Sequence, residues 1–430
     1  MLKFFLVRIL YQISVWLYYA AIVVVSPFNH KASLWLKGRR NWYTRLKNAL
    51  ENNRKPVVWI HCSSLGEFEQ GRPVIEAIRR HSGDEVFILL SFFSPSGYEI
   101  RKDYPVADWV TYLPLDTPRN AKRWTDTVKP ATALFIKYEF WFHFLQAAQH
   151  NETSLFLVSA IFRPNQLFFK WYGSWYRNIL LKFRHIFTQD EHSASLLNKI
   201  GITNVSVSGD TRFDRVIQIA SEEKTLPEAS WFANGHLVLV AGSTWEPDET
   251  LLLRYIAETK FPLKMILVPH EIHPSRLTKI CQSIKVPYSL FSECNENANA
   301  LKRAQVLVVD KMGLLSTLYR YGAIAYIGGG FGKGIHNILE AAVYGMPVLF
   351  GPNYHKALEA RQMKELGCGI PIHSYNELKE HMDQLIGNAR LRENLGEVSA
   401  SYVRENTGAT RTILQHITDF LPAGKAITHT

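Results

Sequence analysis

Short apolar runs alternate with helical patterns along most of this chain, and this alternation constrains its fold more than any other feature. In the first half the runs predict strands at 57–61, 86–90, 133–136 and 155–159, with weaker ones at 185–188 and 205–208. In the second half they predict strands at 237–241, 265–268, 306–309, 323–327 and 348–350. Strands separated by helices form parallel sheets that helices cover on both faces. Because the pattern occurs twice, it predicts two doubly wound α/β domains.

The length of the chain agrees with two domains, since 430 residues exceed what one hydrophobic core usually serves. The stretch 217–232 is polar and loop-like and separates the two halves. We therefore expect an N-terminal anchor at 1–28, a first domain over 29–216, a second domain over 217–420 and a flexible tail at 421–430. Doubly wound domains bind ligands at the carboxyl ends of their strands, so functional residues are expected there.

The N-terminus carries a long apolar run. Residues 4–25 are almost entirely apolar, with Arg8 as their one charged residue. A helix needs about 20 apolar residues to cross a bilayer, so this run is marginal. A cluster of Lys and Arg over 31–47, together with Trp35 and Trp42, suits the cytoplasmic face of an anionic membrane. We predict a membrane anchor; the alternatives are a cleavable signal peptide and a buried helix of the first domain.

The net charge of +11 favours an anionic partner, which would be nucleic acid, an acidic membrane surface or a phosphorylated substrate. The charge alone does not choose among them. Four cysteines lie far apart without a CxxC pair, which argues against a zinc ribbon or a disulfide framework. A reducing compartment is the simplest interpretation of this cysteine usage.

The stretch 323–352 carries the clearest functional pattern. An apolar strand breaks into a glycine-rich turn, continues as a predicted helix with His336, Asn337 and Glu340, and ends in a second strand. Glycines after a strand let the backbone approach a ligand, and free N–H groups at a helix start favour phosphate. Asn337 and Glu340 are three positions apart, so they share a helix face and can both contact one sugar. The stretch therefore predicts a nucleotide-sugar site.

Three further segments of the second half place candidate ligand contacts just after predicted strands. These contacts are Ser243, Thr244, His273, Arg276, Met312 and Gly313. The serine and threonine precede a helix and either cradle a phosphate or only cap that helix. The histidine and arginine suit a nucleotide phosphate or sugar better than a metal, because their segment lacks the i, i+4 spacing of zinc-binding helices. The Met–Gly pair either meets a base or phosphate or forms an ordinary turn.

Two carboxylates of the first half also follow predicted strands. Glu67 comes directly after Gly66 in the first turn of a predicted helix, with Ser64 just before it, and Glu139 ends another strand. A carboxylate at such a place can act as a general base on a hydroxyl. The alternative is an acid favoured by the helix dipole, and the segment around Glu67, taken alone, favours that alternative. Glu139 has an exposed strand end as its alternative.

Two arginines of the first half are candidates for binding anions. Arg163 lies among the aromatic residues of 159–177, a mixture that suits nucleic acid, a phosphorylated lipid or a packed amphipathic helix equally well. Arg212 follows a Gly-Asp turn and either binds an anion or pairs with an aspartate. No Asp-x-Asp triplet, no GxxxxGK[ST] loop and no GxGxxG fingerprint occur in the chain.

Eight ordered blocks together resemble one family, the 3-deoxy-D-manno-octulosonate (Kdo) transferases of lipopolysaccharide synthesis. The blocks are HCSSLGEFEQGRP, KYEFW, SAIFR, SGDTRFD, GSTWEPDE, VPHEIHPSR, DKMGLL and GGGFGKGIHNILEAAVYGMPVLFGP. The resemblance runs from the N-terminus to about residue 411. It implies a GT-B fold, with two Rossmann-like domains that face a cleft, and a position at the cytoplasmic face of the inner membrane.

The resemblance also implies a reaction. An inverting, metal-independent transferase without a cofactor would move Kdo from CMP-Kdo to a hydroxyl of a lipid A precursor of the lipid IVA type, releasing CMP. Glu67 corresponds to the family's catalytic carboxylate, which reverses the interpretation of its segment taken alone. Arg212 and the second-half contacts named above correspond to the CMP-Kdo side, and Ser64, Glu139 and Arg163 are candidates on the acceptor side. The anionic inner-membrane surface is an expected partner, and nucleic acid is not.

The chain departs from the family pattern in three places. Leu314 stands where many members have an acid, Lys137 and Tyr138 replace a common threonine-bearing strand end, and the glycine loop is short. Two alternatives remain open. Another GT-B transferase that uses a UDP-sugar and a lipid acceptor would share the Asn337 and Glu340 pattern. A nonenzymatic basic module would explain the charge but not the two mononucleotide-binding halves.

Overall fold

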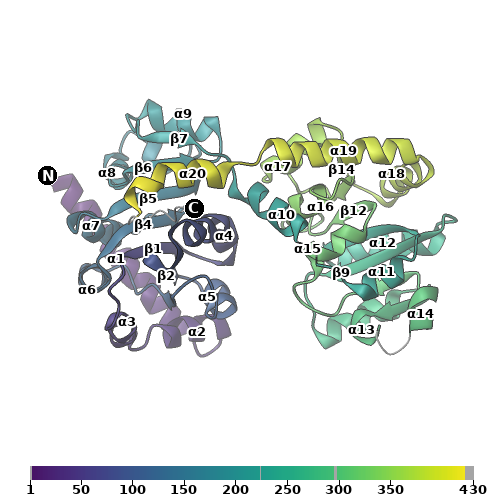
Figure 1. The fold of residues 1–430 in the computed structure, drawn as a ribbon, viewed down its shortest axis with the longest axis horizontal. Helices are drawn as coiled ribbons and strands as arrows, with labels where there is room; N and C mark the ends of the chain where they lie inside the picture. Colours follow the sequence, from purple (N-terminus) through teal and green to yellow (C-terminus); the bar gives the residue numbers. More distant parts are fainter. Residues whose placement is uncertain (1, 223, 295–297, 422–430) are drawn as a thin grey trace, which may run out of the picture. The chain divides into compact units, whose positions relative to one another are not determined.

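A computed structural model describes residues 2–222, 224–294 and 298–421 of the chain. It divides into two compact units (Figure 1). The first comprises the residues up to Arg215 together with those from Thr407 onward, and the second comprises Val216–Asn406. Each unit holds one seven-stranded sheet whose neighbouring strands are all parallel. The expectation of two doubly wound, Rossmann-like domains is confirmed.

The first sheet has the strand order β3-β2-β1-β4-β5-β6-β7. Its strands are β1 Val57–Cys62, β2 Phe87–Phe92, β3 Trp109–Tyr112, β4 Pro130–Ile136, β5 Ser154–Ala160, β6 His185–Thr188 and β7 Val205–Val207. Trp59 and Ile60 are adjacent in β1 and point to opposite faces, yet both are fully buried. Both faces of the sheet are therefore covered, which explains the continuous apolar runs of the sequence.

Helices cover this sheet on both sides. They are α1 Leu2–Val25, α2 His30–Gly38, α3 Trp42–Leu50, α4 Leu65–Ser82, α5 Pro95–Arg101, α6 Pro118–Val128, α7 Phe142–His150, α8 Ser174–Leu180, α9 Glu191–Lys199 and α20 Ala409–Ile417. The helix α10 Thr211–Ser221 begins in the first unit and ends in the second. Short 3-10 turns lie at η1 Gly83–Glu85, η2 Leu167–Phe169 and η5 Thr418–Phe420. One side packs aromatic residues such as Trp124 and Phe144. The other side packs Phe68 and Ile75 of α4.

The last described helix corrects the expected extent of the second domain. Residues 407–420 were expected there, but α20 belongs to the first unit. Its apolar side, with Ile413 and Ile417, enters the same core cluster as Phe68 of α4. Leu421, expected in a flexible tail, is buried in that cluster as well. The remaining tail residues, 422–430, lie outside the described residues.

The second sheet has the order β10-β11-β9-β8-β12-β13-β14. Its strands are β8 Leu237–Thr244, β9 Leu263–Pro269, β10 Tyr288–Leu290, β11 Val306–Val308, β12 Ile324–Ile327, β13 Val348–Phe350 and β14 Gly369–Pro371. Its helices are α11 Pro227–Ala233, α12 Glu246–Glu258, α13 Pro274–Ser283, α14 Ala298–Arg303, α15 Leu315–Leu318, α16 Leu339–Ala342, α17 Leu358–Glu365, α18 Tyr375–Gly387 and α19 Ala389–Glu405, with 3-10 turns η3 Phe291–Glu293 and η4 Tyr319–Tyr321.

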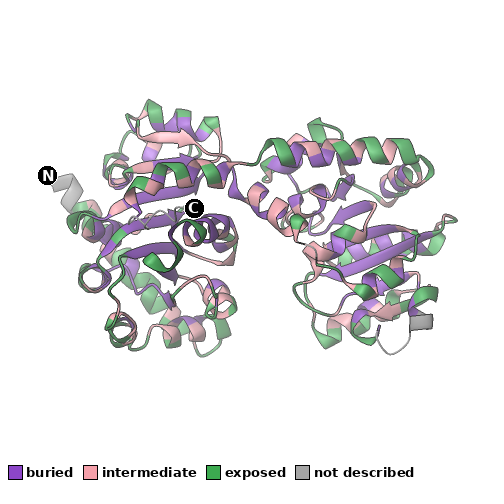
Figure 2. Cartoon of the chain, viewed as in Figure 1, coloured by how far each residue is buried: buried purple, intermediate pink, exposed green. Residues whose placement is uncertain are grey.

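The N-terminal apolar run is a helix, as expected. Within the described part of the chain, Leu6–Val25 of α1 is the one helical segment long and apolar enough to cross a membrane, with a mean hydropathy of 1.5. Only 6% of that segment is buried, so it is not an ordinary core helix. Its outward-facing residues are drawn in green in Figure 2.

Candidate functional site

Each sheet has a topological switch point, where neighbouring strands lead the chain in opposite directions. In the first sheet it lies between β1 and β4, and in the second between β8 and β12. Loops that leave the carboxyl ends of two such strands part from each other, so a crevice forms between them. The candidate residues are therefore described at these two edges, one unit at a time.

Glu67 lies at the switch point of the first sheet. It stands in the first turn of α4, directly after β1, and is half-buried. Ser64 is the N-cap residue of α4, but its hydroxyl accepts no capping bond from a helix amide and instead donates to the Glu67 carboxylate. Cys62 ends β1, and burial raises the pKa of its thiol, with the charges of Glu67 and Glu139 adding to the rise. The charges of both carboxylates therefore disfavour ionisation of the same buried thiol.

Glu139 is held more tightly than Glu67. It is buried, and the Trp141 indole nitrogen donates to its Oε2 at 2.5 Å. Nε2 of the fully buried His61 lies 3.3 Å from the same oxygen without hydrogen-bond geometry, and His61 Nδ1 lies 2.9 Å from Ser91 Oγ. Sequence reasoning missed His61, whose only signal was a polar residue inside a buried strand. Glu139 is thus a buried, partnered carboxylate rather than an exposed strand end.

The same edge carries strained backbone. Lys137 has φ 72° and Ser159 has φ 56°, and these left-handed values are costly for residues with a side chain. Arg163 is exposed beyond β5. Burial raises the pKa of Tyr138, the charge of Arg163 lowers it, and the charges of Asp190 and Glu67 add to the rise. The charges of Arg163 and Glu67 therefore act on the same side chain, with opposite effects on its pKa.

Arg212 lies in the first unit, apart from the other expected donor contacts. Its Nε and Nη2 lie 2.8 and 2.6 Å from Asp210 Oδ2, and its backbone amide donates to Asp210 Oδ1 at 2.9 Å. The pairing with an aspartate, one of the two sequence alternatives, is what the structure contains. The remaining donor candidates all belong to the second unit.

At the switch point of the second sheet, Ser243 is the second-last residue of β8 and has a left-handed conformation with φ 54°. The Thr244 hydroxyl donates to Glu249 Oε1 at 3.1 Å, and Arg276 Nη2 lies 2.5 Å from Glu249 Oε2. Burial raises the pKa of Glu249, although Arg276 opposes the rise. The Glu249 carboxylate thus holds both the Thr244 hydroxyl and the Arg276 guanidinium in position. Two expected ligand contacts already have a protein partner.

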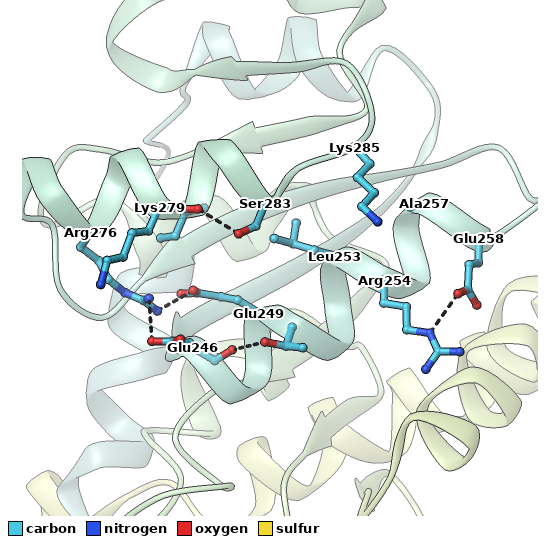
Figure 3. Close-up of a pocket in the computed structure, with 12 residues that line it drawn as sticks. Glu246, Glu249, Leu253, Arg254, Ala257, Glu258, Arg276, Lys279, Ser283 and Lys285 are labelled. Atoms are coloured by element: carbon cyan, nitrogen blue, oxygen red, sulfur yellow. Dashed lines mark hydrogen bonds and ion pairs between the residues drawn. The ribbon is translucent and has the colours of Figure 1, made fainter.

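The Arg276 and Glu249 pair borders a pocket between α12 and α13, with a volume of about 580 Å³ (Figure 3). Leu253 and Ile280 line it, together with the cationic side chains of Lys279 and Lys285. The carboxylate of Glu246 lies 3.7 Å from the Arg276 guanidinium at its rim. Arg276 is the one candidate ligand contact among the lining residues, so the pocket borders the candidate site and is not its centre.

The glycine-rich loop after β12 is packed backbone against backbone. A Cβ on Gly328 would meet the Ser243 carbonyl oxygen at 2.3 Å, and one on Gly330 would meet Gly351 at 2.6 Å. Six amides of the loop donate within the protein, those of residues 328, 329, 332, 334, 335 and 336. The Gly329 amide donates to the buried Asp248 carboxylate at 2.9 Å. The glycines therefore serve close packing, and these six amides are already engaged.

Asn337 and Glu340 meet as expected, but the helix that carries them is shorter than predicted. Asn337 Nδ2 donates to Glu340 Oε1 at 3.0 Å. The helix α16 begins only at Leu339, so His336 and Asn337 precede it. Asn337 Oδ1 accepts from the Leu339 amide at 3.2 Å. Asn337 therefore holds the helix start, and Glu340 lies in its first turn.

A stack of three rings stands at the same edge. The His270 ring stacks on Trp245 with centroids 4.7 Å apart and on His336 with centroids 4.3 Å apart. The Trp245 indole donates to His336 Nε2 at 3.2 Å. Burial lowers the pKa of His336 to about 4, and the charge of His270 contributes. His336 is therefore neutral near pH 7. The spacing of these rings, 91 residues from end to end, hid the stack from sequence reasoning.

The remaining donor candidates are open to solvent. His273 is the N-cap residue of α13 and is exposed, without a side-chain capping bond. Met312 is 78% exposed, and Gly313 has φ 82°, which a side chain would strain. Across the described residues, no group of three or more His, Cys, Asp or Glu side chains is placed to hold a metal ion.

Comparisons with known proteins connect these edges to a family. The family model described as 3-deoxy-D-manno-octulosonic-acid transferase (kdotransferase) matches residues 40–215. The transferase of that name from Aquifex aeolicus is 28% identical over 364 residues, 82% of this chain and 93% of the relative. The one from Rickettsia bellii is 26% identical over 378 residues, 85% of this chain and 88% of the relative.

Solved structures show the same architecture. A putative UDP-N-acetylglucosamine 2-epimerase from Listeria monocytogenes matches with a TM-score of 0.59 at 12% identity, over 85% of this chain and 97% of that chain. UDP-GlcNAc 2-epimerase from Neisseria meningitidis matches with a TM-score of 0.57 at 16% identity, over 85% of this chain and all of that chain. At such low identity these structures support the GT-B-like fold alone. Over most of its length the chain is similar to 3-deoxy-D-manno-octulosonic-acid transferases, and the family model of these glycosyltransferases matches residues 40–215 of its first unit.

Proposed function

We propose that this chain transfers Kdo from CMP-Kdo to a hydroxyl of a lipid A precursor of the lipid IVA type and releases CMP. The observation that carries the proposal is Glu67, a half-buried carboxylate at the switch point of the first sheet, within the residues that the family model matches. The relatives are named as Kdo transferases, and the lipid acceptor follows from the family resemblance. The reaction is proposed to invert the anomeric centre and to need no metal.

Glu67 is the proposed general base. Its carboxylate takes the proton of the attacking lipid hydroxyl, whose oxygen forms a bond to the anomeric carbon of Kdo. The bond from that carbon to the phosphate oxygen of CMP breaks, and CMP keeps the electron pair. The Ser64 hydroxyl, which donates to Glu67, orients the carboxylate. The charges of Glu67 and of the buried Glu139 both raise the pKa of the Cys62 thiol at the end of β1, and this supports a base at that strand end.

The donor is proposed to bind at the switch point of the second sheet. Asn337 and Glu340 would hold the ribose of CMP, since they already meet at 3.0 Å and present an amide and a carboxylate together. His273 and the Met312 and Gly313 turn are exposed and would contact the nucleotide. Because Arg276 is engaged by Glu249, its proposed role is to position Thr244 rather than to bind phosphate directly.

The acceptor lipid and the membrane are proposed partners of the first unit. The helix α1 would attach the chain to the anionic inner membrane, on its cytoplasmic face. Arg163 is exposed and its charge lowers the pKa of Tyr138, so it is the candidate contact for a lipid phosphate. Each cation close to an anionic surface contributes about 1 kcal/mol of attraction.

A donor screen with matched variants tests the proposal. Purified protein is given a lipid A precursor with either CMP-Kdo or a set of UDP-sugars, with and without a chelator of divalent metals. Release of CMP and formation of a Kdo-bearing lipid are expected from CMP-Kdo alone, and the chelator is expected to change neither. Transfer from a UDP-sugar in place of CMP-Kdo would favour the alternative transferase.

The variant Glu67→Gln should lose transfer by about 100-fold or more, because a general base typically contributes 100- to 10,000-fold. Its binding of CMP-Kdo should stay intact. Glu69→Gln is the matched control, since Glu69 lies two positions further along α4 and pairs with Arg101 at 2.7 Å. It should retain turnover. Near-normal turnover in Glu67→Gln would refute the assignment of the base.

A further inference from the structure

The helix α1 is docked along its side on the first unit. Val7 and Tyr11 pack against the core of the first sheet, and Val15 and Ile22 pack in a cluster with Trp35. Steps of three or four residues keep such positions on one helix face. The docked turns from Val7 to Ile22 extend over roughly 22 Å at 1.5 Å per residue. Little of the 24-residue helix remains free to cross a hydrocarbon core of about 30 Å.

The docking also satisfies a buried charge. Asp116 is fully buried, and its carboxylate accepts from the Tyr11 hydroxyl and from the amides of His143 and Phe144 at 3.2 and 3.0 Å. The Tyr11 ring also lies against Phe142 and Trp175, with centroids 5.9 and 5.7 Å apart. If α1 left the unit to span a bilayer, Asp116 would lose a partner and these rings would be uncovered. A buried carboxylate without its partner is costly.

The opposite side of α1 is apolar and exposed. Leu6, Leu10, Ile13, Leu17 and Val24 recur at steps of three, four or seven, and Leu10 and Leu17 are 63% and 66% exposed. These five residues are called the outer stripe. A folded monomer rarely leaves such a continuous apolar surface uncovered.

A second segment of the first unit adds exposed aromatic residues beside this helix. Trp171 and Tyr172 stand between η2 and α8 and are 87% and 54% exposed. Trp175, three positions later, packs on Tyr11 of α1. The pair is therefore anchored next to the helix, and its rings suit the boundary between hydrocarbon and headgroups.

The distribution of charged residues around the outer stripe and the exposed aromatic pair indicates what covers them. Residues 1–50 contain eight Lys and Arg and no Asp or Glu, and residues 153–189 contain five Lys and Arg and no Asp or Glu. These two acid-free stretches carry the outer stripe and the exposed aromatic pair. Arg8 and Lys31 are exposed within the first of them. An apolar stripe flanked only by cations complements an anionic lipid bilayer, whereas a protein partner would impose no such exclusion of acids.

We propose that α1 lies in the plane of an anionic bilayer instead of crossing it, with the outer stripe and Trp171 and Tyr172 inserted together as two contacts of one membrane-binding surface. The inference rests on the membrane attachment within the proposed function and adds the orientation of the helix and the second contact. Both ends of α1 then stay on the same side of the membrane as the rest of the chain.

A protease test on the otherwise unchanged chain decides the orientation. An N-terminal tag with a specific protease site is added before Met1, and the purified protein is bound to preformed vesicles of phosphatidylcholine with about one third phosphatidylglycerol. In-plane binding leaves the site outside the vesicle, so protease should remove the tag from nearly all bound protein. A tag that is protected until detergent is added would overturn the proposal, since the helix would then span.

Vesicle cosedimentation tests the two contacts. The double variants Leu10→Glu with Leu17→Glu, and Trp171→Ala with Tyr172→Ala, should each lower partitioning by about tenfold or more. The control variants Leu366→Glu and Trp231→Ala change exposed residues of the second unit and should leave vesicle partitioning unchanged. Unaltered binding of the aromatic double variant would refute the second contact. The parent protein could instead dimerise without lipid and not bind vesicles, and the outer-stripe variant could abolish that dimer. This result would show that a second copy of the chain, and not the bilayer, covers the outer stripe.

These readouts do not involve Kdo transfer. Loss of transfer with intact in-plane binding would reject the proposed reaction and leave the membrane surface standing. A protected tag together with active transfer would reject the orientation and leave the reaction standing.

Discussion

The buried carboxylate of Asp248 is predicted to hold the two loops of the donor edge together. Its Oδ2 accepts from the amides of Trp245 and Gly329, both at 2.9 Å, and its Oδ1 accepts from the Tyr326 hydroxyl at 2.7 Å. One amide belongs to the loop after β8 and the other to the glycine loop after β12. Removing the carboxylate should therefore loosen the switch point itself, and the cost can be worked out bond by bond.

The substitution Asp248→Ala leaves three buried hydrogen-bond donors without their acceptor: the amides of Trp245 and Gly329 and the hydroxyl of Tyr326. A buried donor without a partner costs about 1–3 kcal/mol, so the loss of all three partners should lower the local stability by roughly 3–9 kcal/mol. Asp248→Asn is the matched control. Its amide oxygen can still accept from both backbone amides, while its NH2 group donates to the Tyr326 oxygen, so the charge and the acceptor for the Tyr326 hydroxyl are lost but both loop amides keep their partner. We expect that variant to lose less than about 2 kcal/mol.

Hydrogen exchange of the peptide over 324–337 measures the effect. A loss of 3 kcal/mol corresponds to exchange more than about 100-fold faster at the Gly329 amide. Exchange of β1 in the first unit serves as an internal reference and should not change. Exchange of the loop in Asp248→Ala within about tenfold of the parent protein would refute the reasoning, and so would an Asn variant as damaging as the Ala variant.

Three further predictions concern pH and helix capping. Burial raises the pKa of Asp116 to about 6, so the folded protein favours the protonated form of this carboxyl. The stability that this preference confers is present below about pH 4 and is lost as pH rises through 6. Thermal unfolding of the parent protein, but not of Asp116→Asn, should therefore include up to about 3 kcal/mol of such pH dependence. Asp214→Ala should destabilise α20 by about 1–2 kcal/mol in calorimetry, because Asp214 accepts from the amides of Gly408 and Thr410 at 2.7 and 2.6 Å. Burial lowers the pKa of His336 to about 4, so its neutral form stabilises the fold above about pH 6.5, and this stability is lost as pH falls through 4. CMP affinity, measured by calorimetry, should therefore not depend on the protonation of His336 from pH 6.5 to 8.

The parts of the fold that sequence reasoning found share one property. Most of the predicted strands are buried on both faces, so they read as continuous apolar runs; the half-buried edge strand β7 gave one of the two weaker predictions of the first half. The strands that it missed, β3, β10 and β14, all lie at sheet edges. An edge strand has one strand neighbour and less cover, and β14 even contains a glycine and a proline, which read as a turn.

The candidate site divides in the same way. Glu67 and the pair of Asn337 and Glu340 were found because each follows a strand within a short span of sequence. Asp248 was missed because its partners are backbone amides and a tyrosine 78 residues away. The contact between Tyr11 and Asp116 joins residues 105 positions apart, so no local pattern marks it. Long-range polar contacts of this kind need the fold before they can be seen.

The central claim is that this chain attaches Kdo to a lipid A precursor with Glu67 as the base. Mass spectrometry of the lipid after incubation with CMP-Kdo tests it most directly, with the parent protein, Glu67→Gln and Glu69→Gln side by side. The account predicts lipid heavier by one or more Kdo residues with the parent and with Glu69→Gln, and unmodified lipid with Glu67→Gln. Unmodified lipid with the parent protein, or full modification with Glu67→Gln, would contradict it.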